Sequence, residues 1–222
     1  MIPPVDGEGN WVWRESRPDV EVVFTGRGWG ETAGEVLGRA VEAAPPVAWA
    51  RQIHSARVLA ARAGGCGEGD ALVAAERGLA LSVITADCVP VVLAGPGGAA
   101  AVHAGWRGLA AGVIGATLAE LGDGNLSGWT AWIGPAIGPC CYEVSEDVAA
   151  EVAAASTAAC VVPGKGERPH LDLQAAARRQ LERGGVGEVV TVVRCTRCHE
   201  DLWSYRRDGR GGRNHAFIWQ TI

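Results

Sequence analysis

Short runs of apolar residues alternate along this chain with longer segments in which apolar residues recur every three or four positions. Runs of the first kind are typical of strands, and segments of the second kind are typical of amphipathic helices. The runs predict strands at residues 21–25, 47–53, 79–86, 99–102, 129–133, 189–193 and 216–222. The periodic segments predict helices at residues 35–44, at 106–121, from Ser145 onward, and from Asp172 to Gly184. This alternation of strands and helices favours a layered α/β fold.

Turn and capping residues support two of these helix ends. Pro45 and Pro46 stop the helix that begins at residue 35, because proline lacks the N–H that a continuing helix would need. The apolar residues that share one face of the segment 106–121 are Ala110, Ile114, Leu118 and Leu121. Gly122 follows at the position where a C-terminal cap is expected.

The segment TADCVPVVLAGPGGAAAVHAGWRG contains Cys88 and His103, each next to an apolar run. Between them, Pro96-Gly97-Gly98 supplies the turn chemistry for an antiparallel return of the chain. We therefore expect Cys88 and His103 to lie side by side, where a thiol and an imidazole suit a metal or a nucleophile. Either residue alone also fits ordinary burial, since free cysteine packs like a small hydrophobe.

A second imidazole lies at the end of another predicted strand, in Gln52-Ile53-His54-Ser55. Two histidines and one cysteine are a ligand set for zinc, and leaving the fourth position to water is typical of catalytic zinc. The long spacing of His54, Cys88 and His103 matches no short zinc motif. From the residues alone, a metal or catalytic site and ordinary packing are about equally supported.

Composition and charge limit the classes of partner. The chain has 222 residues, a formal net charge of −5 and a sequence pI of about 5.6. This acidic balance, together with the lack of a long Lys/Arg run, argues against a nucleic-acid partner. No linker or low-complexity tract divides the sequence, so we expect one domain over residues 1–222.

The N-terminal sequence MIPPVDGEGNWVW has neither the basic start nor the apolar core of a secretion signal. No apolar stretch approaches the roughly 20 residues that span a bilayer, so no membrane partner is expected. We expect a cytoplasmic protein. The seven cysteines are an odd number, and a reducing compartment predicts that they form no structural disulfide.

Eight motifs occur in order along the chain: QIHSARV, GDALV, TADCVPVVL, AVHAGWRGLAAGVI, AWIGPAIGPCCYEV, HLDL, RCT and LWSYRRDGRGGR. With this series the chain resembles the bacterial YfiH family. Members of that family were once called multicopper polyphenol oxidases or laccase-like proteins, and the family is related to the human purine-metabolising protein FAMIN. The resemblance covers nearly the whole chain.

The resemblance implies an α/β fold, a single-domain three-layer α/β/α sandwich with a mixed sheet, similar to bacterial toxin deamidases. It implies a catalytic zinc site, whose ligands fall on His54, Cys88 and His103, with copper only as a replacement metal. It also implies purine nucleoside chemistry. The expected reactions are phosphorolysis of adenosine or inosine with inorganic phosphate, giving free base and ribose 1-phosphate, and deamination of adenosine; methylthioadenosine is a further candidate substrate.

Two arginines are candidates for substrate binding. Gly105, Arg107 and Gly108 place a guanidinium and free backbone N–H groups at the start of the predicted helix 106–121, which favours an anion site. We expect Arg107 to bind phosphate near the metal; the alternative is a surface arginine or an ion pair. Arg27, in FTGRGWG, resembles the family's FTxRxGG segment and is expected to reach the same pocket.

The chain departs from the family pattern directly after Arg27. The family usually continues through a loop with an SLNLG-like motif, whereas GWGETAG at residues 28–34 runs almost directly into a predicted helix. The asparagine that the family places near the substrate is therefore missing, and the preferred nucleoside stays open.

Asp87, beside Cys88, and Asp70, in GDALV, are the acidic residues nearest the expected ligands. The H-x-E and P-C-x-x-C signature of zinc deaminases is absent, so deamination would need another general acid or base. Asp70 and Asp87 are candidates for that role at the substrate. Both could equally orient the ligating histidines.

Other polar and thiol residues receive simpler interpretations. Cys195-Thr196-Arg197-Cys198 is a single CxxC with no second CxxC to complete a zinc ribbon, so Cys198 is interpreted as incidental. Cys140 and Cys141, in a rigid Gly/Pro loop, are interpreted as packing residues. Arg206 and Arg207 are expected to stabilise the site through ion pairs.

Three other functions remain open from the sequence. The first is a Cys-His hydrolase or transferase in which Cys88 is a nucleophile activated by His103. The second is a copper-dependent polyphenol oxidase, although five histidines without a His-x-His pair make a multicopper cluster hard to build. The third is a non-catalytic, zinc-stabilised binding module.

Overall fold

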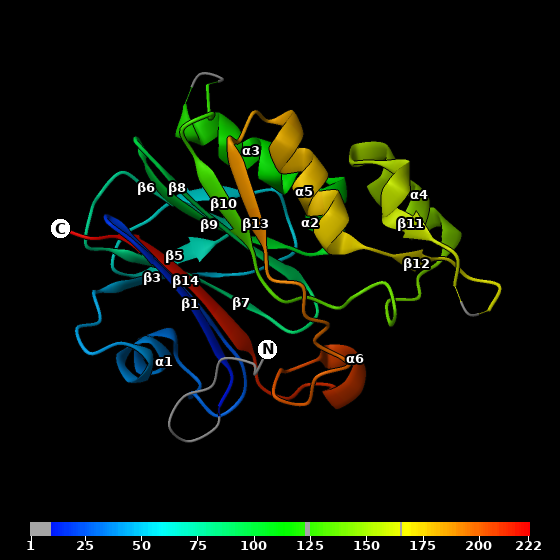
Figure 1. The fold of residues 1–222 in the computed structure, drawn as a ribbon, viewed down its shortest axis with the longest axis horizontal. Coiled ribbons are helices and arrows are strands. Elements are labelled where there is room, and N and C mark those ends of the chain that lie inside the picture. The colour runs from blue at the N-terminus through cyan, green and yellow to red at the C-terminus, as the bar shows by residue number, and fades with distance from the viewer. Residues whose placement is uncertain (1–9, 123–124, 165) are drawn as a thin grey trace.

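The computed structural model describes residues 10–122, 125–164 and 166–222. Residues 1–9, for which no secretion signal is expected from the sequence, lie outside the described residues. Most described strands belong to two six-stranded sheets, each containing both parallel and antiparallel neighbours (Figure 1). Among the described residues, no helix combines the length and the apolar character that crossing a membrane would require.

The first sheet has the strand order β1-β2-β14-β7-β3-β5. Its members are β1 (Val12–Arg17), β2 (Val20–Thr25), β14 (Asn214–Gln220), β7 (Ala80–Thr85), β3 (Val47–Arg51) and β5 (Gly64–Glu68). The pairs β7/β3 and β3/β5 are parallel and the others antiparallel. The predicted strands at 21–25, 47–53, 79–86 and 216–222 therefore all lie in this sheet, with their ends shifted by one to two residues.

The second sheet has the order β13-β10-β8-β9-β6-β4. Its members are β13 (Glu188–Thr191), β10 (Thr130–Ile133), β8 (Val89–Gly95), β9 (Gly98–Ala104), β6 (Ala71–Ala74) and β4 (Val58–Ala60). A separate two-stranded ladder joins β11 (Val161–Val162) to β12 (His170–Leu171). The pairing of β10 with β13 is parallel, so the segments that follow these two strands leave the sheet at the same edge.

Helices cover the outer faces of the two sheets. Helix α1 (Ala33–Ala40) packs on β3 and β14, while α3 (Val113–Leu121) and α5 (Leu173–Arg183) pack on the second sheet. The sheets face each other through β7 and β14 on one side and β8 and β9 on the other. The predicted α/β class is confirmed, and the middle of the sandwich holds two mixed sheets where the sequence had suggested one (Figure 1).

Three apolar clusters fill the spaces between these layers. Phe24, Leu81 and Trp132 belong to the cluster between the two sheets. Ile114 and Leu181 belong to the cluster between the second sheet and its helices, and other residues pack under α1. Burial of these side chains is the main favourable contribution to holding the layers together.

The predicted helix at 106–121 is two helices, which corrects the sequence interpretation. Helix α2 (Trp106–Ala110) ends before Gly112, whose φ of 81° is left-handed, and α3 begins at Val113. Glycine adopts this conformation at little cost, so the chain turns there although the apolar periodicity continues. Gly122 caps α3 as expected. The remaining helices are α4 (Glu146–Ala155), α6 (Tyr205–Asp208) and a 3-10 turn at Ala158–Cys160.

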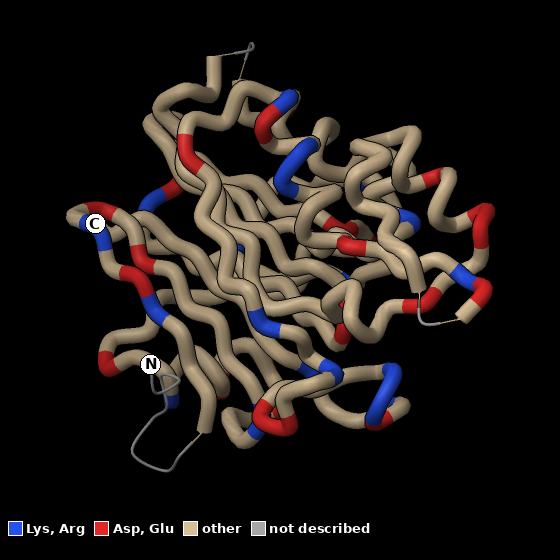
Figure 2. Tube along the Cα trace, turned by 45° about the vertical axis from the view of Figure 1, so that its right-hand side comes forward, with Lys and Arg blue, Asp and Glu red and all other residues tan. Residues whose placement is uncertain are grey.

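Figure 2 shows that charged residues of both signs are interspersed in small groups along the chain trace. Many of them form ion pairs close to the sheet edges, such as Arg17 with Glu188 at 2.8 Å and Arg51 with Glu68 at 2.6 Å. Exposed pairs of this kind contribute little to stability. The fold therefore depends on its apolar layers rather than on these charges.

His215 is a buried titratable group within the first sheet, and its effect on stability can be tested. Burial alone lowers the pKa of His215 to about 4, and its Nδ1 has no hydrogen-bond partner. Because the unfolded chain binds a proton near pH 6.5, the folded state should lose up to about 3 kcal/mol as the pH falls from 6.5 towards 4. Urea unfolding of the wild type and of His215→Leu at pH 7 and pH 4.5 measures this loss. If the two proteins lose equal stability between these pH values, His215 is not the cause.

Candidate functional site

The three residues grouped from the sequence lie together at one end of the β8/β9 hairpin. Cys88 directly precedes β8, and the hairpin register places Pro90 opposite His103 and Val89 opposite Ala104. The potential ligand atoms of His54, Cys88 and His103 all lie within 4.8 Å of one another. The Cys88 Sγ is 3.9 Å from the His54 Nε2. The expectation that His54, Cys88 and His103 lie close together is therefore confirmed. The strand that pairs with the His103 strand is β8, which follows Cys88, and not the predicted strand at 79–86, which precedes it.

Local backbone geometry brings His54 to this site. Its φ of 60° is left-handed, which an ordinary residue adopts only when its surroundings hold it there. A Cβ on Gly105 would lie 3.0 Å from the Cys88 Sγ and 3.1 Å from the His54 Cδ2. Gly105 therefore leaves the space in which the thiol and the imidazole meet. A larger residue at this position of the AVHAGWRG motif would collide with both side chains.

Asp70 holds the two histidines in place. Its buried carboxylate accepts hydrogen bonds from the backbone N–H groups of His54 at 2.9 Å and Ser55 at 2.6 Å. It also accepts from the Ser55 hydroxyl at 2.7 Å and pairs with the His103 Nδ1 at 2.8 Å. A bond from Nδ1–H leaves the His103 Nε2 free for a ligand. The contacts thus give Asp70 the orienting role, the second of the two roles considered from the sequence.

The electrostatics of this group favour an ionised thiol. Burial opposes ionisation of Cys88, but interaction with His103 and His54 outweighs it and lowers the pKa of Cys88 to about 6. Burial also opposes the charged form of His103, yet Asp70 and Cys88 raise the pKa of His103 to about 9. The same hydrogen bonds hold the pKa of Asp70 well below its usual range. At neutral pH the metal-free site thus contains a thiolate, which is the form that binds metals and acts as a nucleophile.

Asp87 occupies a similar supporting position on the other side of Cys88. Its φ of 90° is left-handed, and both carboxylate oxygens have protein partners. The Thr196 hydroxyl donates to Oδ1 at 2.6 Å, and the Arg206 N–H donates to Oδ2 at 2.7 Å. The Asp87 carbonyl accepts from the Ile137 N–H at 2.9 Å. These contacts fix the backbone that carries Cys88.

The donor set suits a borderline-soft divalent metal. One thiolate and two imidazoles are ligands of that class, with His103 losing its extra proton when a metal binds. The exposure of the three side chains increases from His103 through Cys88 to His54. The exposed side of His54 leaves one approach open to a small molecule. The three side chains can therefore hold a metal ion in a position that substrate can reach.

Comparison with known proteins decides the family. A sequence model described as multi-copper polyphenol oxidoreductase laccase matches residues 31–221, and solved relatives carry the family names DUF152 and YfiH. The chain belongs to the YfiH family. The resemblance noted from the eight motifs is thereby confirmed.

Members of the YfiH family with similar sequences include proteins named as purine nucleoside phosphorylases. The protein SCO2081 of Streptomyces coelicolor is 47% identical over 182 residues, which are 78% of this chain and 74% of that protein. YfiH of Escherichia coli is 37% identical over 177 residues, covering 77% and 72% of the two chains. The crystal structure of Neisseria meningitidis NMB0706 matches with a TM-score of 0.82 and 32% identity, covering 95% and 99%.

The two arginines expected at the YfiH substrate pocket differ in their surroundings. Arg107 is exposed at the start of α2, with its guanidinium 4.4 Å from the centre of the Trp106 ring. Arg27 forms an ion pair with Asp208 and lies 3.9 Å above the Trp203 ring. Arg107 is therefore available to an anion. The substrate-binding role of Arg27 stays a prediction, and it would require a ligand that shares or displaces these contacts.

The segment where this chain departs from the YfiH pattern lines a cavity of about 320 Å³. Residues 31–34 form one wall, and Trp49, Gln52 and His215 contribute to the others. The Ser82 hydroxyl, also in the lining, is buried without a partner. A larger cavity of about 670 Å³ lies between α4 and residues 161–164 and 166–169, and its described lining includes none of the candidate site residues.

The sequence alone places Tyr142 only in a rigid Gly/Pro loop suited to lining a pocket, whereas the structure shows that the charges of this YfiH site act on it. Tyr142 is buried, and the Arg206 guanidinium lies 4.9 Å from its ring centre. Burial, together with the negative charges of Cys88 and Asp87, raises the pKa of Tyr142 to about 12. Its hydroxyl thus stays protonated at neutral pH and can donate a hydrogen bond.

Proposed function

We propose that this chain is a zinc-dependent purine nucleoside phosphorylase of the cytoplasm, with adenosine or inosine and inorganic phosphate as substrates. The observation that carries this proposal is the His54–Cys88–His103 group, supported by Asp70, in a chain whose relatives are named purine nucleoside phosphorylases. Zinc is the preferred metal because the set combines one thiolate with two imidazoles. When bound, zinc supplies Lewis acidity to an oxygen of the substrates.

The protein side chains bind and orient the two substrates. The Arg107 guanidinium binds phosphate through two parallel hydrogen bonds and orients one phosphate oxygen towards the ribose C1′. That oxygen forms the new bond to C1′ while the C1′–N9 bond breaks. The purine leaves with the bonding electrons and takes up the proton that hydrogen phosphate loses. The protonated Tyr142 hydroxyl donates a hydrogen bond to the bound substrate. The products are the free base and ribose 1-phosphate.

Deamination of adenosine ranks below phosphorolysis in this proposal. It needs a group that transfers protons at C6 of the base, and the two candidate carboxylates are Asp70 and Asp87. Protein donors contact both oxygens of each carboxylate. Proton transfer through either one would break contacts that hold the site.

The same assay tests both reactions. Purified, zinc-loaded protein is incubated with adenosine or inosine, with and without phosphate, and the products are separated by chromatography. Release of adenine or hypoxanthine only with phosphate supports phosphorolysis, and conversion of adenosine to inosine supports deamination. No turnover of either nucleoside overturns the proposal and leaves a binding module.

Replacement of Arg107 tests the phosphate site. Arg107→Ala should raise the KM for phosphate by about 10-fold or more, since a charge-assisted bidentate contact contributes roughly 1.5 to 3 kcal/mol. The KM for the nucleoside should change little. Arg51→Ala is the matched control, because Arg51 is an exposed arginine paired only with Glu68. An equal rise in both KM values would assign Arg107 to general positioning instead.

A further inference from the structure

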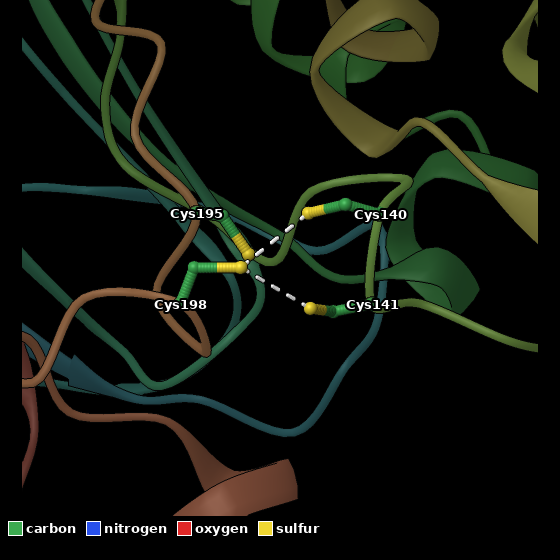
Figure 3. Close-up of side chains that lie close together, drawn as sticks. All are labelled: Cys140, Cys141, Cys195 and Cys198. Atoms are coloured by element: carbon green, nitrogen blue, oxygen red, sulfur yellow. Dashed lines mark hydrogen bonds between the residues drawn. The ribbon is translucent and has the colours of Figure 1, made fainter.

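Four cysteines form a second cluster that no proposed reaction uses. Cys140 and Cys141 lie in the segment after β10, and Cys195 and Cys198 lie in the segment after β13 (Figure 3). All four Sγ atoms lie within 4.8 Å of one another. The Cys198 Sγ is 3.6 Å from that of Cys140 and 3.4 Å from that of Cys141. In Figure 3 the four thiols point towards a common centre.

The backbone is built to bring these thiols together. The parallel pair β10/β13 continues as a bridge between Ala136 and Cys195. The Gly138 N–H donates to the Cys195 Sγ at 3.2 Å, and a Cβ on Gly138 would lie 3.3 Å from the Cys140 Sγ. A glycine at this position therefore keeps space for two sulfur atoms. A backbone N–H directed at a cysteine sulfur stabilises a thiolate.

We propose that Cys140, Cys141, Cys195 and Cys198 bind one structural zinc ion. Four thiolates without any other donor are a closed ligand set typical of structural zinc. A Zn–S bond of about 2.3 Å in a tetrahedron places sulfur atoms about 3.8 Å apart. The two distances from the Cys198 Sγ, 3.6 and 3.4 Å, lie just below that value, and no two of the four sulfur atoms are more than 4.8 Å apart.

Charge and connectivity favour a metal over a disulfide. Arg197 contacts the Cys141 carbonyl, and the Arg207 guanidinium donates to the carbonyls of Thr196 and Arg197 at 2.9 Å. These positive charges offset part of the double negative charge of a zinc tetrathiolate. A disulfide from Cys198 would use only one of two nearly equidistant partners and leave two thiols without a role.

This second metal would hold the segments that fix the first site. Thr196, between the two cysteines of the CxxC, donates to the Asp87 carboxylate, and Ile137 donates to the Asp87 carbonyl. Asp87 in turn precedes Cys88. A zinc ion bound by the four thiolates would thus hold the loops after β10 and β13 together, next to the candidate active site. The proposal stands whether or not that site processes nucleosides.

Zinc stoichiometry tests the second site. The protein, purified under reducing conditions in the presence of zinc, should contain about two zinc ions per chain, one for each site. Elemental mass spectrometry measures the bound zinc. Cys195→Ser and Cys88→Ala should each retain one, and the double variant none. Cys66→Ser is the matched control and should retain two, because Cys66 is a free thiol in β5 outside both clusters.

Cobalt spectroscopy decides the case in which Cys195→Ser does not fold. The Cys88→Ala variant keeps all four thiols, and loading it with Co²⁺ should give the intense sulfur-to-metal absorption of a tetrahedral thiolate site. Absence of that absorption overturns the proposal. It is also overturned if the wild type holds one zinc that Cys88→Ala alone removes, or if thiol labelling shows that Cys198 is oxidised.

Discussion

Replacement of Cys88 by serine is expected to remove the metal from the His54–Cys88–His103 site and to lower the rate of phosphorolysis by about 10³-fold or more. Metal assistance contributes several kcal/mol to the transition state, and each 1.36 kcal/mol is a factor of ten in rate. Serine cannot replace the thiolate, because its hydroxyl does not ionise at neutral pH. Cys88 reaches that state through His103 and His54, which lower its pKa to about 6. Metal content and turnover are measured on the same preparation.

A chelation experiment separates this role from that of a nucleophile. If Cys88 is a ligand, a chelator should abolish activity, added zinc should restore it, and bound zinc should protect Cys88 from alkylation. A Cys-His hydrolase would instead stay active without metal and would be inactivated by alkylation. Cys66→Ser, which changes a thiol of β5, should behave as wild type. A fully active Cys88→Ser protein would contradict both roles.

The turn of the hairpin at the centre of the site was predictable because its signal is local, although the strand predicted at 79–86 lies in the other sheet and β8 begins only after Cys88. The Pro-Gly-Gly turn between two apolar runs dictates an antiparallel return, and the register then places Cys88 next to His103. His54 was harder to place. It belongs to the other sheet's β3 segment, and it reaches the site through Asp70, whose carboxylate binds three successive N–H groups from Ile53 to Ser55. No periodicity reveals such a contact; the grouping of His54 with Cys88 and His103 rested on its place at a strand end and on the family resemblance.

The features that the sequence did not reveal depend on long-range packing. Among the described strands β1 pairs with β2 alone, and its sequence VWRESR has no clear alternation of apolar and polar residues. The division of the strands into two sheets follows from which β-strands pair, and hydrophobic runs do not encode this choice. The cysteine cluster was missed for a related reason. A zinc ribbon is recognised by two CxxC motifs, whereas here the second half is the adjacent pair Cys140-Cys141, 54 residues before Cys195 along the chain, counted from Cys141.

Asp70→Asn should weaken metal binding at the His54–Cys88–His103 site by about 10- to 100-fold, the usual cost of losing a carboxylate that orients a ligating histidine. All contacts of the Asp70 carboxylate are donors: backbone N–H groups, the Ser55 hydroxyl and the His103 Nδ1. An amide has one oxygen to accept them and an NH₂ group that would face a donor. The variant therefore loses the contact to His103 or the one that fixes His54. Loss of the negative charge also lowers the pKa of His103, which Asp70 raises.

Competition with a fluorescent zinc chelator measures this change in affinity. Asp172→Asn is the matched control, since Asp172 caps α5 by accepting the Ala175 N–H at 2.9 Å and lies outside both metal clusters. It should leave both the free energy of unfolding and the zinc affinity nearly unchanged, because asparagine caps a helix about as well as aspartate. If Asp70→Asn lowers the free energy of unfolding but leaves the zinc affinity unchanged, Asp70 supports the fold and does not orient the ligands. A lower affinity for zinc, with a slower turnover that excess zinc partly restores, would instead show that the carboxylate orients the metal ligands. This is the outcome that its contacts predict.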